Sequence, residues 1–328
     1  MNLHLYLQNQ LNHLQNCKDL VVDGDTHPSS QQYIDEVIGW DNYKNSSYYQ
    51  GRPVAVSDLL DEMSAAKVDK CLIWQNPALT KYADDQDYNF EILLKANRDI
   101  FNVGKEYQDK FLPAGWTDPK ALGQEKARRL TEILVKEFGF PVVKMNPAQN
   151  SYPIDSPEVF ALVEQIVALG AVPAFHFGGD TEFTPPVGLA KVASSFPHSK
   201  IIGVHMGGGG SHFVHGDETY QGAREVGLQH NNIFYVLSAI RDTHIYSNVQ
   251  AYLKKGDPWV QNLNIGSDAP YGRLSWNFNG FKGILDEINQ KISVTEDIRK
   301  KLMGNNLLAL YTKALQKVLE LNFNHVNF

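Results

Sequence analysis

The feature that most constrains the fold is a regular alternation of short apolar segments with longer amphipathic ones. Between the short segments, apolar residues recur at the 3.6-residue period of helices. Strand–helix alternation of this kind favours a parallel sheet with crossover helices. Eight such units over roughly 300 residues predict an α/β chain closed into a single (β/α)8 TIM barrel, with an open doubly wound sheet as the alternative. The eight predicted strands are Asp19–Asp25, Val68–Gln75, Phe111–Thr117, Pro141–Asn146, Val172–Phe177, Lys200–Met206, Ile233–Ser238 and Asn262–Ser267.

The two ends of the chain carry additional helical patterns. Leucines at positions 3, 7, 11 and 14 follow one face of a helix, so we expect residues 1–17 to form a short helical extension. Residues 18–328 then form the barrel, which ends in a C-terminal helix. The N-terminal segment is too polar for a signal peptide, and no apolar run is long enough to span a bilayer.

Charge and cysteine content narrow the class of protein. The net charge is −7, and no block of basic residues is present, which argues against nucleic-acid and membrane partners. The two cysteines, Cys17 and Cys71, are far apart and outside any ligand spacing, so a disulfide framework is not expected. These features favour a cytoplasmic protein that acts on a small molecule. A homo-oligomer is compatible with the sequence, although no feature demands one.

Unusual polar residues stand at the carboxyl ends of the predicted strands, which form the active-site face of such barrels. They come from strands one, four, five, six and eight: Asp25, His27, Lys144, His176, His205 and Asp268. Because side chains alternate along a strand, Asp25 and His27 share one face. Imidazoles and carboxylates around one point are typical of a divalent-metal site, for which we predict Asp25, His27, His176 and Asp268.

Three of these residues also have an ordinary explanation. His176 in VPAFHF resembles a core histidine, Asp25 suits a turn that bonds backbone amides, and Asp268 suits a helix cap. These explanations do not account for all four residues lying at the same end of the barrel. We therefore favour the metal site.

Several segments together resemble a known family. In chain order they are VDGDTHP, LLDEMSAAKVDKCLI, KFLPAGWTDP, FGFPVVKMNP, VPAFHFGG, KIIGVHMGG, NIGSDAP and MGNNLLALY. This set resembles the amidohydrolase superfamily, in the branch called amidohydrolase-related family 2, which includes aminocarboxymuconate-semialdehyde-type decarboxylases. The resemblance implies that His27 and His176 bind metal and that His205 contacts substrate. It also implies that Asp268 both approaches the metal and transfers protons.

One position departs from the family pattern. The family usually has His-x-His on the first strand, and here Asp25 takes the first position. Some decarboxylases of the family carry an acidic residue there, so one divalent ion is still expected. A carboxylate in place of an imidazole shifts the preference toward Mn²⁺ relative to Zn²⁺. Asp23 is a competing ligand on the same face, but it lies deeper in the barrel.

Substrate contacts are predicted from residues that follow the strands. Besides His205, the candidates are Lys144, Arg52, Arg241 and Arg273, whose positive charges suit a carboxylate-bearing substrate. Lys144 has two other interpretations, an ion pair with one of the carboxylates around the predicted metal and a bridge between two metals. The loop from His27 to Val56 is rich in aromatic residues and is expected to cover the site.

The same residues serve two reactions. The first is hydrolysis, in which metal-activated water attacks a lactone, ester or amide carbonyl of a small carboxylate substrate. Asp268 is then the general base and His205 polarises the carbonyl. The alternative is non-oxidative decarboxylation of an aromatic or enoic acid, with Asp268 or His205 protonating the carbon. A third hypothesis is a barrel that only binds and has lost catalysis.

Overall fold

Nine parallel strands form the centre of the computed structural model, which describes residues 2–39, 55–77, 79–178, 181–208, 218–238 and 242–323. The eight predicted strands are confirmed, except that the third is divided at Ala114 into two short strands. The strands are β1 Val22–Thr26, β2 Lys70–Ile73, β3 Phe111–Pro113, β4 Gly115–Trp116, β5 Val142–Met145, β6 Val172–His176, β7 Ile201–Val204, β8 Ile233–Leu237 and β9 Leu263–Ile265.

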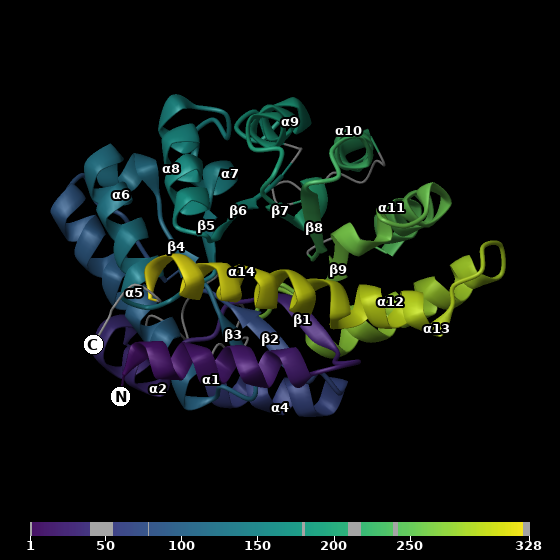
Figure 1. Cartoon of the computed structure of the whole chain (residues 1–328), viewed down its shortest axis with the longest axis horizontal. Helices are drawn as coiled ribbons and strands as arrows, with labels where there is room; N and C mark the ends of the chain where they lie inside the picture. The colour runs from purple at the N-terminus through teal and green to yellow at the C-terminus, as the bar shows by residue number, and fades with distance from the viewer. Residues whose placement is uncertain are drawn as a thin grey trace.

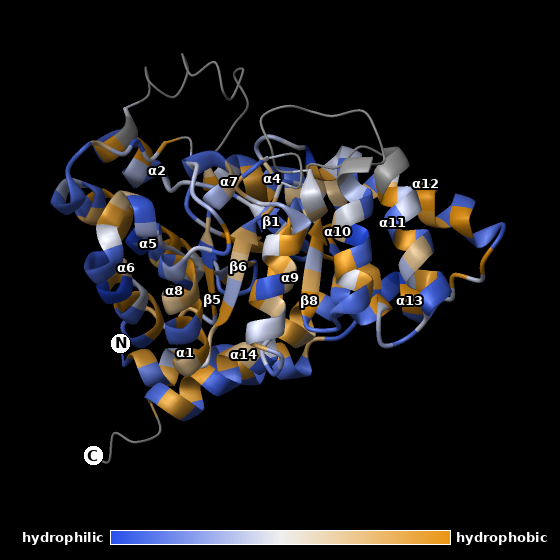
Figure 2. Ribbon diagram, turned by 90° about the horizontal axis from the view of Figure 1, so that it is seen from above, coloured by the Kyte–Doolittle hydropathy of each residue, from blue (hydrophilic) through white to orange (hydrophobic). Residues whose placement is uncertain are grey.

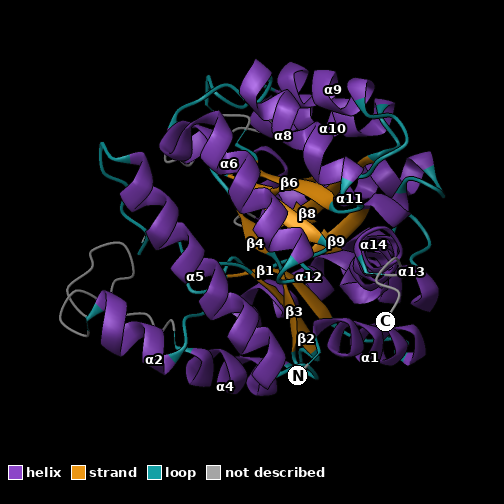
Figure 3. Ribbon diagram, turned by 60° about the vertical axis from the view of Figure 1, so that its left-hand side comes forward, coloured by secondary structure: helices purple, strands orange, loops and turns teal. Residues whose placement is uncertain are grey.

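The strands form two hydrogen-bonded sheets, β1-β2-β3 and β4 through β9 in sequence order. The sheets are continuous through Ala114, whose N–H donates to Ile73 on the β2 side. They meet again beyond β9, where the His27 N–H donates to the Ala269 carbonyl (2.8 Å) and the Asp268 N–H donates to the Asp25 carbonyl (2.9 Å). These bonds join the two edges, and Figure 3 shows the strands at the centre of a ring of helices.

Helices cover the outside of the strands (Figure 1). The helices are α1 Leu3–Asn16, α2 Gln31–Tyr33, α4 Val56–Ala66, α5 Gln86–Glu106, α6 Pro119–Lys136, α7 Pro147–Asn150, α8 Pro157–Ala168, α9 Pro186–Ser195, α10 Glu218–Gln229, α11 Asp242–Lys255, α12 Leu274–Asn289, α13 Glu296–Lys300 and α14 Asn306–Asn322.

The two predicted terminal helices, α1 and α14, pack side by side across one end of the barrel (Figure 1). The apolar stripe of α1, which includes Leu7, Leu11 and Leu14, is buried in the common core. On α14, the Tyr311 hydroxyl donates to the Pro113 carbonyl at the end of β3 (2.9 Å). The helical extension is therefore packed on the barrel, and the boundary at residue 17 stays a prediction.

Apolar side chains line the strands and the inner faces of the helices, and polar residues lie on the outer faces (Figure 2). This distribution follows from the buried parallel strands, which need apolar residues on both faces. Within the described part of the chain, no helix combines the length and apolarity required to cross a membrane.

The predicted covering loop begins with helical structure. Residues Gln31–Tyr33 form α2 and residues Ile34–Ile38 continue as one turn of π-helix, η1. Tyr33 belongs to this segment, whereas Trp40, Tyr43, Tyr48 and Tyr49 lie outside the described residues. Four glycines, at positions 207–210, follow β7, and of these the structure describes Gly207 and Gly208.

The break between β3 and β4 yields a stability prediction at Asn97 on α5. Its buried side chain accepts from the Trp116 N–H (2.7 Å) and donates to the Trp116 carbonyl (2.9 Å). Asn97→Ala leaves both buried backbone groups unpaired, so we expect a loss of about 2–4 kcal/mol in the free energy of unfolding. Urea denaturation measures this loss. The control is Glu91→Ala, an exposed position on the same helix; equal stability of the two variants would contradict the prediction.

Candidate metal centre

Asp25 lies at the centre of the candidate site, at the carboxyl end of β1, and it is fully buried. Its Oδ1 accepts from the Trp74 indole N–H (2.8 Å) and from the Lys144 ammonium (3.3 Å). Its Oδ2 accepts from the Ser238 hydroxyl (2.8 Å). These donors come from the ends of β2, β5 and β8, so one carboxylate connects three other parts of the barrel.

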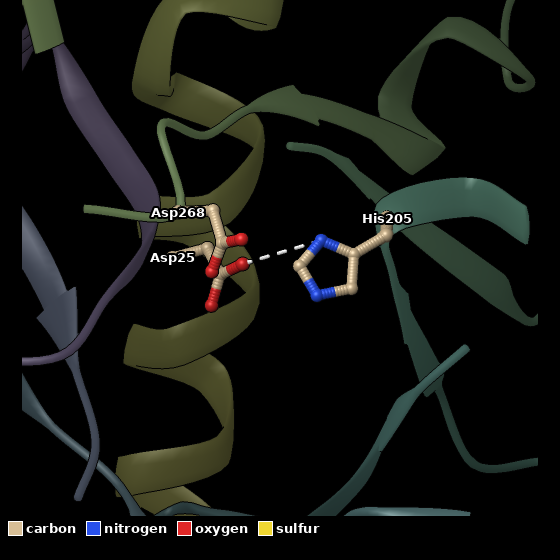
Figure 4. A group of neighbouring side chains, drawn as sticks. All are labelled: Asp25, His205 and Asp268. Carbon is tan, nitrogen blue, oxygen red and sulfur yellow. Dashed lines mark ion pairs between the residues drawn. The ribbon is translucent and has the colours of Figure 1, made fainter. Parts of the chain in front are cut away.

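Two further groups face Asp25 and Asp268. His27 Nε2 lies 3.4 Å from Asp25 Oδ1 and 3.5 Å from Asp268 Oδ1. His205 Nδ1 lies 3.6 Å from Asp25 Oδ2, and Figure 4 shows this ring directed at the two carboxylates. Among the described residues, Asp25, His205 and Asp268 offer ligand atoms that all lie within 4.8 Å of one another.

His176, the fourth predicted ligand, joins this group through His205. Its Nδ1 lies 3.2 Å from His205 Nε2, and the two rings meet edge to face with centroids 4.4 Å apart. The structure therefore places Asp25, His27 and Asp268 in direct mutual contact, with His176 beside His205. His205, which we predicted to contact substrate, also lies close enough to Asp25 and Asp268 to belong to this group.

Charge explains the protonation states around Asp25. Burial alone would raise the pKa of Asp25, but Lys144, His27 and His205 outweigh it and hold that pKa well below its usual range. Burial lowers the pKa of His205 despite the nearby carboxylates. For His27, hydrogen bonds to Asp25 and Asp268 overcome burial and raise the pKa. Near neutral pH, Asp25 is thus ionised and His205 is neutral.

The donor set fits a divalent cation. His27 Nδ1 lies 2.9 Å from the Gln75 carbonyl oxygen, which only accepts, so this nitrogen carries a proton. Nε2 faces two carboxylate oxygens, so it holds either a second proton, in keeping with its raised pKa in the metal-free protein, or a cation in the place of that proton. The balance of charge also favours a bound cation, because Asp25 and Asp268 bring two negative charges and Lys144 supplies only one positive charge. Neutral nitrogen with carboxylate oxygens is a donor set for Zn²⁺ or Mn²⁺.

Lys144 forms an ion pair with Asp25, one of the carboxylates of the predicted metal site, as one of its predicted alternatives states. Its side chain is fully buried, and its Nζ lies 4.2 Å from the Trp74 ring centroid and 5.0 Å from that of Trp116. Burial lowers the pKa of Lys144, and Asp25 and Asp268 oppose this effect. Cation–π contacts and the Asp25 carboxylate both stabilise the charged amine. Because its ammonium is directed at Asp25, this position favours the ion pair over a substrate contact.

Asp23, the competing ligand, has a different role in the structure. Its Oδ1 accepts from the backbone N–H groups of Asp25 (3.1 Å) and Ser267 (2.8 Å) and so ties β1 to the segment after β9. Burial raises the pKa of Asp23 to about 7. It therefore supports the backbone below the site. Among the described residues, it is not one of the three whose ligand atoms lie close together, which are Asp25, His205 and Asp268.

The remaining predicted substrate contacts are arginines. Arg273 Nη1 lies 3.1 Å from Glu62 Oε1, a pair that holds the start of α12 against α4. Arg52 and Arg241 lie outside the described residues. Substrate binding by these three side chains stays a prediction.

Two site residues have unusual backbone conformations. His205 has φ 74° and Asp268 has φ 60°, in the left-handed region that non-glycine residues seldom adopt. Such conformations cost about 1–3 kcal/mol each and persist only where the surrounding structure imposes them. In both cases the unusual residue immediately follows a strand or its extension at the carboxyl end of the barrel.

Sequence reasoning missed four residues that shape the site. Trp74 and Ser238 contact Asp25, while Trp116 and Tyr271 pack around His27 with ring centroids 6.2 and 6.0 Å away. Trp74 directly follows β2 and Ser238 directly follows β8. The rule that selected the other site residues, a polar group at the end of a strand, applies equally to these two.

Comparison with known proteins identifies the family. The model of the Amidohydrolase family matches residues 90–313, more than half of the chain. The chain therefore belongs to the Amidohydrolase family, as the sequence motifs predicted. Among curated proteins, none matches it significantly.

Solved structures confirm the barrel fold. An uncharacterized TIM-barrel protein of Bordetella bronchiseptica has a TM-score of 0.64 at 16% identity, covering 90% of this chain and 99% of its own. 2,6-Dihydroxybenzoate decarboxylase from Rhizobium has a TM-score of 0.62 at 16% identity, with coverages of 89% and 98%. 5-Carboxyvanillate decarboxylase from Novosphingobium aromaticivorans, complexed with manganese and 4-hydroxy-3-methoxy-5-nitrobenzoic acid, has a TM-score of 0.64 at 14% identity, with coverages of 89% and 96%. At these identities the likeness shows the fold alone.

The buried ion pair yields a prediction at Lys144. Lys144→Met leaves the Asp25 carboxylate buried without its cation, so we expect about 3–5 kcal/mol lower free energy of unfolding in metal-free buffer. Urea denaturation in the presence of a chelator measures this difference. Lys282→Met, at an exposed position on α12, is the control. A Lys144→Met protein as stable as the control would show that Lys144 does not balance the charge of Asp25.

Proposed function

We propose that the chain is a metal-dependent enzyme that removes CO₂ from a small aromatic acid without oxidation. The observation that carries this proposal is the aromatic wall around His27, formed by Trp74, Trp116 and Tyr271 with centroids 6.0–6.5 Å from the imidazole. Trp74 and Trp116 are buried, with the Lys144 ammonium over both rings, whereas Tyr271 is half-buried and is the ring of this wall that offers exposed surface. A planar substrate ring packs well against an exposed aromatic side chain of this kind.

The proposed metal ligands are Asp25, His27, His176 and Asp268, with one divalent ion per chain. When bound, the ion supplies Lewis-acid polarisation of substrate oxygens. Two carboxylates among four ligands favour Mn²⁺ relative to Zn²⁺. Two decarboxylases of hydroxybenzoates share the fold, and one of these structures holds manganese, which supports the same direction.

The reaction requires one proton and releases one molecule of CO₂. The bond between the ring carbon and the carboxylate breaks, and its electron pair stays on the ring carbon. Asp268 passes a proton from solvent to that carbon and is again a carboxylate when the step ends. Asp268 suits this role because 13% of its side chain is exposed, whereas the Asp25 side chain has no exposed surface. Lys144, His27 and His205 keep Asp25 ionised throughout.

Hydrolysis of a lactone, ester or amide is the second candidate. The same exposure of Asp268 favours it, because a general base must reach both water and the leaving group. In this reaction Asp268 accepts the proton of the attacking water and later delivers it to the leaving group. The two candidates therefore share residues and differ in the product, CO₂ or a hydrolysed acid.

Metal content tests the proposed ligand set. We expect about one divalent ion per purified chain, and we expect its loss in His176→Ala, because the four-ligand site then lacks one donor. Elemental analysis after dialysis measures both. His198→Ala, at an exposed position before β7, is the control and should keep the ion. If neither the wild type nor the control binds metal after supplementation, the binding-only hypothesis replaces both reactions.

Turnover separates the two reactions. We expect the manganese-loaded protein to release CO₂ from a hydroxybenzoic acid in a screen that also includes lactones. Asp268→Asn should keep about one ion per chain, because the amide oxygen can still ligate, and should lose about 10²–10⁴-fold in turnover, because it carries no transferable proton. Hydrolysis of a lactone with no CO₂ from any aromatic acid would replace decarboxylation with the second candidate.

A further inference from the structure

Four polar side chains form a continuous hydrogen-bonded chain through the site. His176 Nδ1 lies 3.2 Å from His205 Nε2, and His205 Nδ1 lies 2.9 Å from the Ser238 hydroxyl oxygen. The Ser238 hydroxyl is in turn 2.8 Å from Asp25 Oδ2. All four residues are buried, and they come from the ends of β6, β7, β8 and β1.

The direction of every bond in this chain is fixed by groups that only accept. The Asp25 carboxylate accepts, so the Ser238 hydroxyl donates to it. His205 Nδ1 faces the Ser238 hydroxyl oxygen and, at 3.3 Å, the Ser238 backbone carbonyl, which also only accepts. Nδ1 of His205 must therefore carry the proton, because a lone pair there would face carbonyl and hydroxyl oxygen lone pairs.

The bond between His205 and His176 places the proton on His176. A neutral His205 with its proton on Nδ1 has a lone pair on Nε2. Nδ1 of His176 is the group that faces this lone pair, so it carries a proton and donates. The unprotonated nitrogen of His176 is then Nε2. His27 reaches the same tautomer by a separate route, through its Nδ1–H bond to the Gln75 carbonyl (2.9 Å).

We infer that Ser238 is a positioning residue that, through His205, holds His176 in the tautomer whose Nε2 can bind a metal. This inference rests on the metal centre of the proposed function and adds a residue to it. It also assigns His205: both of its ring nitrogens are engaged, by Ser238 and by His176, so His205 supports a ligand instead of being one. His205 is one of the three residues whose ligand atoms lie close together, because its Nδ1 lies near Asp25. The proton on this Nδ1, however, already bonds to the oxygen acceptors of Ser238.

Support of this kind has a measurable size. Hydrogen bonds that orient a metal-binding histidine from behind fix both its tautomer and its ring plane, and their loss typically costs about 10- to 100-fold in metal affinity. Ser238→Ala removes the link between Asp25 and His205. Ser238→Thr keeps a hydroxyl at the same position, and Ser194→Ala, at an exposed position on α9, controls for the loss of a serine elsewhere.

The first experiment is nitrogen-15 NMR of histidine-labelled, metal-free protein at neutral pH, with signals assigned from His176→Gln and His205→Gln. We expect His205 and His176 both to carry the proton on Nδ1. The His205 Nδ1 proton should shift in Ser238→Ala, because its nearer acceptor is gone, and should keep its position in Ser238→Thr and Ser194→Ala. A proton on Nε2 of either histidine overturns the inference.

The second experiment measures the Mn²⁺ dissociation constant by competition with a chelator. Ser238→Ala should weaken binding by about 10- to 100-fold, whereas Ser238→Thr and Ser194→Ala should stay near the wild-type value. Unchanged affinity in Ser238→Ala overturns the positioning role. The tautomers are measured without metal or substrate, so they remain informative if the protein turns over no aromatic acid; that result would count against the proposed function alone.

Discussion

The buried carboxylate of Asp25 is the interaction on which the rest of the site depends. A carboxylate without exposed surface is tolerated only when its charge is balanced and its oxygens are hydrogen-bonded. Here Trp74, Lys144 and Ser238 meet that requirement from three different strands. Each of these side chains is oriented by the bond that it makes to Asp25. The carboxyl end of the barrel is thus organised around one anion.

The backbone around this anion is equally constrained. His205 and Asp268 both have positive φ, and each lies just beyond the carboxyl end of a strand. The Asp268 N–H donates to the Asp25 carbonyl, and its own carbonyl accepts from the N–H groups of Tyr271 and Gly272. These bonds hold Asp268 in a conformation that it would not adopt alone. The position of its carboxylate beside His27 is therefore set by the main chain as well as by charge.

Much of the fold and part of the site follow from sequence alone. Buried parallel strands are continuous apolar runs, so their number and order could be predicted, and polar residues at their ends selected Asp25, His27, His176, His205 and Asp268. The division of the third strand at Ala114 could not be predicted, because it depends on which neighbouring strand accepts a single hydrogen bond.

The contacts among the site side chains could not be predicted either. Trp74 and Ser238 stand at strand ends like the predicted site residues, but their bonds to Asp25 exist only once the barrel closes and each side chain adopts one rotamer. Arg273 shows the same limit from the other side. A long charged side chain can reach several partners; in the structure it pairs with Glu62, and substrate binding by Arg273 stays a prediction.

The packing of α14 has a consequence for the order of folding. Tyr311 bonds to Pro113 across almost 200 positions of sequence, and α14 lies against α1 at the end of the barrel opposite the site. Contacts so distant in sequence form only after long loops have closed, which slows folding. During synthesis, the base of the N-terminal strands stays uncovered until α14 has left the ribosome. The residues of α14 thus decide when these strands become protected from aggregation.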